Sequence, residues 1–191
     1  MTCAGPLSGL IIDRPVGRKC LAVSAKPLPP ATRQNFSRPM TDAIPPLLLT
    51  PQQLAERVRD AMWAGDHATK MLGMGIAEVG PGRAVIHMTV RQDMLNGHAI
   101  CHGGLITTLA DSSFAFACNA YNELTVASGF TVDLLAPGRL GDVLTATCTE
   151  LAKAGRTGVY DVDVRNQRGE RIAAFRGRSH TQRGTPVVPL D

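Results

Sequence analysis

Residues 72–90 predict a β-hairpin, in whose second arm hydrophobic positions recur at every second residue. Residues 72–79 and 83–90 flank the turn-forming triplet Gly80-Pro81-Gly82. In the second arm apolar side chains alternate with polar or charged ones, which indicates a strand with one face on a core. The apolar positions of that arm are Ala84, Ile86, Met88 and Val90.

Helical spacing replaces this alternation on both sides of the hairpin. Before it, Thr50 and Pro51 supply an N-cap and a first-turn proline, and a shorter helical segment follows Asp66. The spacing places one apolar face on the first helix: Leu54, Val58 and Met62. After the hairpin, residues 104–120 form an apolar stretch that predicts a long buried helix.

Four further segments read as strands, at residues 124–136, 142–152, 157–166 and 171–182. Glycine or proline breaks separate them, and Tyr160, Val162 and Val164 alternate with polar side chains. An apolar helix beside such strands can bury both of its sides only if a curved antiparallel sheet wraps it. The sequence therefore predicts an α+β fold built in this way.

The folded domain is expected to span residues 47–183, with a short tail at residues 184–191. Residues 1–46 are rich in proline and arginine, show no helical or strand period, and are expected to be disordered. Three interpretations stay open for this basic extension: a plain tail, a translation start upstream of a real one at Met40, and a targeting segment. The first two are favoured together, because prolines interrupt any amphipathic targeting helix.

Composition excludes two classes of partner. The chain carries a net charge of +4, but residues 1–39 hold six basic residues against one acidic residue, and the remainder is almost neutral. The domain thus lacks the basic, aromatic-studded surface of a nucleic-acid binder. No apolar stretch approaches the ~20 residues needed to span a bilayer. The five cysteines include no CxxC pair, which favours free thiols and a cytoplasmic location.

Five segments, in order, resemble the phenylacetate-degradation thioesterases, a family with the hotdog fold that acts on acyl-CoA. They are MLNGHAICHGG, LADSSFAFACN, LLAPGRLGDVLTA, TGVYDVDVRNQ and AFRGRSH. The resemblance runs from about Asp66 to His180. The hotdog fold, a curved antiparallel sheet around one long central helix, is also the architecture that the hydrophobic pattern predicts.

The start of the long helix and a carboxylate near its middle are the expected catalytic groups. The glycines of His102-Gly103-Gly104 let an acyl carbonyl approach unpaired helix N–H groups, with the Gly103 N–H as principal donor. Asp111 is the expected general base or nucleophile. The two alternatives are a glycine-rich helix start without a ligand and a structural, hydrogen-bonded Asp111; the resemblance favours function.

Spacing predicts that two chains share this site. Gly103 and Asp111 are eight residues apart, or roughly 12 Å along one helix, so they cannot meet one thioester carbon within a single chain. Antiparallel helices across a two-fold axis would bring Gly103 of one subunit beside Asp111 of the other. A homodimer is expected, assembling further to a tetramer.

The resemblance implies further substrate-binding residues. Asn96 and His98 match positions near the thioester, Gly104 belongs to the glycine pair, and Ser112 stands where the family often carries Thr. His102 is expected to orient the acyl group or to support the loop. His98 and His102 also form HxxxH, but the surrounding glycines favour a loop, so no metal is expected.

The predicted function is hydrolysis of an aromatic, hydroxyphenylacetyl-type acyl-CoA to the free acid and CoA, without a metal or redox cofactor. The alternative is a hotdog module that binds acyl-CoA without cleaving it, and a hotdog dehydratase is a weaker rival. Ser112 and Ser113 lack a GxSxG elbow, and the sequence neighbours Cys101 and His102 do not by themselves make a catalytic dyad.

Overall fold

The structure, a computed structural model, describes residues 49–190 of the chain. The predictions made for residues 1–46, including the possible start at Met40, therefore lie outside the described residues. Within the described range, no helix is both long enough and apolar enough to cross a membrane.

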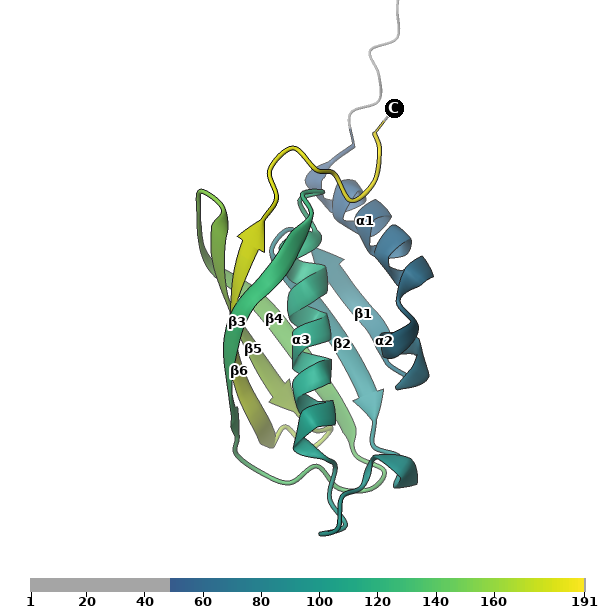
Figure 1. Cartoon of the computed structure of the whole chain (residues 1–191). Helices are drawn as coiled ribbons and strands as arrows, with labels where there is room; N and C mark the ends of the chain where they lie inside the picture. The colour runs from purple at the N-terminus through teal and green to yellow at the C-terminus, as the bar shows by residue number, and fades with distance from the viewer. Residues whose placement is uncertain (1–48, 191) are drawn as a thin grey trace, which may run out of the picture. The chain divides into compact units, whose positions relative to one another are not determined.

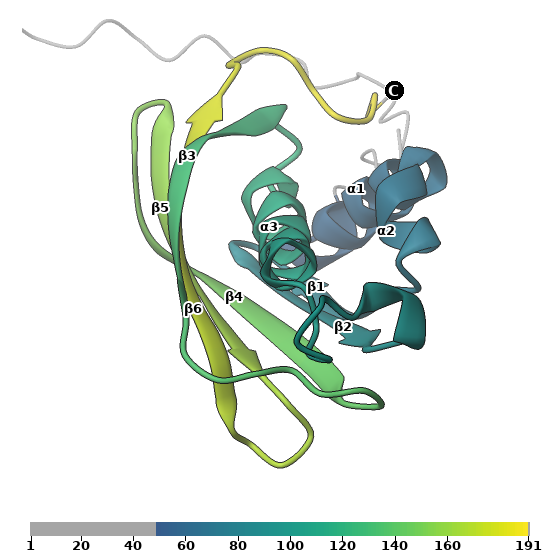
Figure 2. The same cartoon turned by 60° about the horizontal axis from the view of Figure 1, so that its bottom comes forward.

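One antiparallel sheet of six strands curves around a long helix, as the hydrophobic pattern predicts (Figures 1 and 2). The sheet order is β1-β2-β4-β5-β6-β3. The helices are α1 (Pro51–Gly65), α2 (His67–Met71), the short 3-10 helix η1 (Gln92–Met94) and α3 (Gly103–Asn119). The strands are β1 (Gly75–Gly80), β2 (Arg83–Thr89), β3 (Thr125–Leu134), β4 (Val143–Ala154), β5 (Thr157–Arg165) and β6 (Arg171–Thr181).

The first helix begins where its capping residues predict. The Thr50 side chain accepts a hydrogen bond from the Gln53 N–H, and the Gln53 side chain accepts one from the Thr50 N–H, which completes a capping box. Of the predicted apolar face, Val58 is buried, whereas Leu54 and Met62 are half-buried. Ala55 is fully buried instead, so the face that meets the core is turned slightly from the predicted one.

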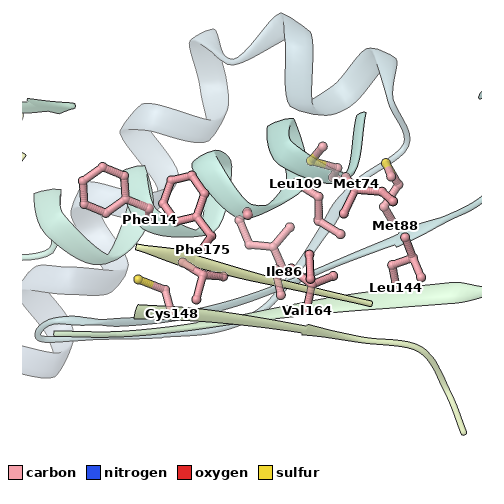
Figure 3. Packing of buried hydrophobic residues seen from close by; sticks show 14 of the residues in the cluster. Met74, Ile86, Met88, Leu109, Phe114, Leu144, Cys148, Val164 and Phe175 are labelled. Carbon is pink, nitrogen blue, oxygen red and sulfur yellow. The ribbon is translucent and has the colours of Figure 1, made fainter. Parts of the chain in front are cut away.

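The predicted alternation of β2 and β5 sets their buried faces. The four apolar positions of residues 84–90 are at most 1% exposed, and Tyr160, Val162 and Val164 are at most 2% exposed. These side chains and those of β4 and β6 meet α3 on the concave side of the sheet, where Leu109 lies over Ile86 and Val164 (Figure 3). The period of two thus identified the strand faces correctly.

Strand β3 occupies the edge of the sheet farthest from β1. Only β4, β5 and β6 run as a meander, because β3 pairs with the last strand, β6, and leaves β2 to pair with β4. All five pairings are antiparallel. The connection through α3 therefore carries the chain across the concave face from one side of the sheet to the other.

Leu109→Ala is expected to lower the free energy of unfolding by about 3 kcal/mol, because Leu109 is completely buried between α3 and the sheet and its loss leaves a cavity. Urea denaturation of the two proteins measures the difference. The matched control is Leu140→Ala, where the side chain is 55% exposed and the change should be small. Equal losses for the two variants would contradict this account of the core.

Candidate active site

The first turn of α3 leaves one backbone donor free. His102 is the N-cap residue, and its Nδ1 accepts the Gly104 N–H at 3.0 Å. Among residues 49–190 no group accepts the Gly103 N–H. This donor lies at the positive end of the helix dipole, where it can stabilise negative charge on an oxygen.

The loop before α3 places Asn96 in the wall of the cavity that Gly103 also lines. The Asn96 Oδ1 accepts the His98 N–H at 2.9 Å and the Ile100 N–H at 3.4 Å, so it holds the turn, which includes Ala99 at a φ of 57°. With the side-chain amide oriented by these bonds, its NH2 group has no acceptor within the described residues. The amide is thus available to a ligand.

Asn96 and Gly103 line one cavity of about 410 Å³, together with residues of β3 and of the segment after it. A side chain at Gly103 would place its Cβ 2.5 Å from the Leu134 Cδ1, so glycine permits the close approach of β3 here. His98 is exposed and does not line the cavity. The structure therefore brings Asn96 and Gly103 together and leaves His98 outside.

Asp111 is half-buried and has no hydrogen-bond or ion-pair partner among residues 49–190. Removal from water raises the pKa of this carboxyl above its ordinary value. Asp111 lines a second cavity, of about 330 Å³, that shares no lining residue with the Gly103 cavity. In the described part of the chain, Asp111 therefore lacks the hydrogen bonds that the structural alternative requires.

Ser112 points away from both cavities. Its hydroxyl lies 3.4 Å from that of Thr69 in α2, and the Thr69 hydroxyl donates to Asp66. Successive helix residues point in directions about 100° apart, so neighbours in sequence need not share a site. Within one chain, Ser112 therefore lies apart from the groups that line the two cavities.

The cysteines are placed as protonated thiols. Burial raises the pKa of Cys101, which lines the Gly103 cavity, and raises the pKa of Cys118 to about 12. Cys148 is buried as well. A protonated thiol is a poor nucleophile, which argues against chemistry at Cys101. No group of three or more potential metal ligands occurs within the described range.

Two residues that line the Asp111 cavity had no functional signal in the sequence. Met62 comes from α1, where it was predicted only as part of an apolar face, and Val187 comes from the segment after β6. The sequence signal that this segment packs on the domain is the adjacent apolar pair Val187 and Val188.

His102→Ala is expected to lower the free energy of unfolding by about 1 kcal/mol, because it removes the side-chain acceptor that caps α3. His102→Asn restores an acceptor at the N-cap and should recover most of that loss. Thermal melts of the three proteins measure the effect. Equal destabilisation by both substitutions would contradict a capping role for this side chain.

Comparison with known proteins identifies the family. Residues 98–173, which include α3, β3, β4, β5 and only the first residues of β6, match the sequence model of the thioesterase superfamily. The chain is 47% identical over 125 residues to the acyl-coenzyme A thioesterase PaaI of Escherichia coli, an alignment that covers 65% of this chain and 89% of that one.

Solved structures agree with this assignment. The structure of the E. coli PaaI protein from the phenylacetic acid degradation operon superposes with a TM-score of 0.70 and 44% identity, covering 71% of this chain and 99% of that one. A hypothetical thioesterase of Streptococcus pneumoniae, solved with coenzyme A, has a TM-score of 0.56 and 26% identity, covering 57% and 88%. The chain therefore belongs to the thioesterase superfamily, within the PaaI-type family of hotdog-fold acyl-CoA thioesterases.

Proposed function

We propose that this protein hydrolyses aromatic, hydroxyphenylacetyl-type acyl-CoA thioesters to the free acid and CoA, at a site that two copies of the chain share. One observation carries the proposal. The free Gly103 N–H and the unpaired Asp111 carboxylate belong to residues roughly 12 Å apart along the axis of α3, and these residues line separate cavities. Neither cavity alone holds both groups.

The chemistry follows from these two groups. The Gly103 N–H, helped by the Asn96 amide, polarises the thioester carbonyl and stabilises the oxyanion that forms. Asp111 accepts a proton from the attacking water, and collapse of the intermediate expels CoA as a thiolate that is then protonated. In the alternative route the carboxylate itself attacks, forming an anhydride that water hydrolyses. Both routes require ionised Asp111.

The free edge of β3 supports the pairing of two copies. β3 is an edge strand, so one side of its backbone has no neighbouring strand in the described chain. It and the residue after it expose large apolar side chains: Val126, Phe130, Leu134 and Leu135. Both cavities reach this edge, through Val126 and Leu134 respectively. Antiparallel pairing of β3 with its copy about a two-fold axis would also set the two α3 helices antiparallel.

The aromatic substrate class rests on the relatives. The E. coli PaaI protein is a product of the phenylacetic acid degradation operon, and the S. pneumoniae thioesterase was solved with coenzyme A. An apolar cavity beside Asp111 fits a compact acyl group. We expect the dimers to pair further into a tetramer. The rival, an acyl-CoA-binding module, would bind these compounds without releasing a thiol, whereas unpaired Asp111 favours the enzyme.

Asp111→Asn is expected to lower kcat by a factor of about 10² to 10⁴, because the amide can neither accept the proton nor attack the carbonyl. Release of CoA thiol from hydroxyphenylacetyl-CoA measures the effect. The matched control is Asp60→Asn, at an exposed carboxylate of α1 that lines neither cavity. Turnover by Asp111→Asn within a few-fold of the unmodified protein would disprove the assignment.

The pH dependence of kcat/KM tests the same assignment, because the direction of the change is known in advance. Since the ionised carboxylate is needed, kcat/KM should rise with pH through a pKa above that of an ordinary Asp. The same raised pKa also stabilises the fold in acid: this contribution is complete below the unfolded pKa and is lost as pH rises through the folded pKa. Asp111→Asn should therefore melt no lower than the unmodified protein at pH 7.

A mixing experiment tests whether two subunits share the site. Gly103→Pro removes the N–H donor at a first-turn position that accepts proline, and Gly103→Ala adds a Cβ but keeps the donor. Co-expression of Gly103→Pro with Asp111→Asn should restore about a quarter of normal activity, because half of the dimers contain one intact site. If both groups act within one subunit, no activity returns.

A further inference from the structure

The cavity beside Asp111 has the size and shape for one compact group. It follows α3 through Asp111, Ala115 and Cys118, a distance of roughly 10 Å at the rise of a helix. Its volume is about 330 Å³. Benzene occupies an engineered protein cavity of about 150 Å³, so this cavity has room for a substituted ring.

The walls of this cavity offer one free charged group. The Asn119 side chain is engaged, since its Nδ2 donates to the Thr125 carbonyl at 2.8 Å and its Oδ1 accepts the Thr125 N–H at 2.9 Å. The Thr125 hydroxyl is bonded to the Glu123 carbonyl and lies 3.1 Å from the Thr181 hydroxyl. The part of a ligand that lies inside the cavity must therefore be apolar, and the polar end of the ligand must lie at Asp111.

Two elements from opposite ends of the domain complete the walls. Met62 of α1 and Val187 of the segment after β6 both line the cavity. Both residues lie outside residues 98–173, the part that matches the superfamily. The superfamily sequence model therefore does not include the part of the cavity that these two residues form.

The segment after β6 is fixed in place; we call residues 182–190 the C-terminal strap. The Asn122 side chain donates to the Val188 carbonyl at 2.9 Å and accepts the Val188 N–H at 2.8 Å, and all these atoms are buried. The Leu124 N–H donates to the Thr185 carbonyl, and the Arg57 side chain of α1 reaches the Pro189 carbonyl. Figure 1 shows the strap passing from β6 over the end of α3 towards α1.

We propose that the apolar part of the acyl group lies in this cavity and that Val187 and Met62 limit its size. The inference rests on the proposed thioesterase function and adds to it the residues that select the substrate. The thioester lies at Asp111, and the acyl group extends along α3 towards Cys118 and the strap. The strap thereby holds Val187 at a fixed distance from the reacting carbon, which makes the enzyme selective for a single ring over larger groups.

Substitution of Val187 tests the proposal. Val187→Phe should lower the ratio of kcat/KM for phenylacetyl-CoA to that for acetyl-CoA by about tenfold or more, because the added ring occupies the cavity. Met62→Phe, on the opposite element, should act in the same direction. Val187→Ala should raise the ratio of kcat/KM for naphthylacetyl-CoA to that for phenylacetyl-CoA. Leu190→Phe, an exposed strap position that does not line the cavity, is the matched control and should change neither ratio.

The outcomes separate the inference from the function. The inference is supported if each Val187 variant shifts its own ratio of kcat/KM values as predicted and Leu190→Phe shifts neither. The contrary outcomes are that Val187→Phe and Val187→Ala leave both ratios unchanged, or lower kcat/KM for all the thioesters by the same factor. Either result means that Val187 acts only on the fold, so the inference is overturned while the thioesterase function stands. If the unmodified protein releases no thiol from any of these thioesters, the proposed function fails and the inference with it.

Discussion

Burial of one long apolar helix is the constraint on which the rest of the structure depends. A single sheet covers only one side of α3, so the sheet must curve, and the remaining sides need other cover. Within the described chain that cover comes from α1 and the C-terminal strap, which Arg57 links through the Pro189 carbonyl. The β3 edge stays uncovered, with Phe130 and Leu134 exposed.

The candidate site exists because the burial of α3 is incomplete. Asp111 lies at the boundary between the apolar core and the uncovered side, where partial loss of water raises its pKa but leaves it accessible. At the end of the same helix, Gly103 keeps an unused N–H because the His102 side chain satisfies Gly104 instead. A helix buried on all sides would have required partners for both groups.

Much of the fold could be predicted because short periods report directly on burial. The alternation in β2 and β5 identified their inward faces, and the capping residues at Thr50 marked the start of α1. The position of β3 could not be predicted, since pairing with β6 joins residues far apart in sequence. The resemblance named Asn96, Gly103 and Asp111 as site residues, but the position of Val187 in the cavity depends on how the chain returns after β6.

The sequence by itself determined the elements, their apolar faces and the eight-residue spacing that separates Gly103 from Asp111, because these depend on local backbone geometry. Tertiary structure alone decided which cavity each group lines. It turned Ser112 towards Thr69, placed Asn96 and Gly103 around one cavity, and put Val187 in the wall of the cavity that Asp111 lines. These juxtapositions arise from packing between segments distant in the chain, a quantity that no local period of hydrophobicity encodes.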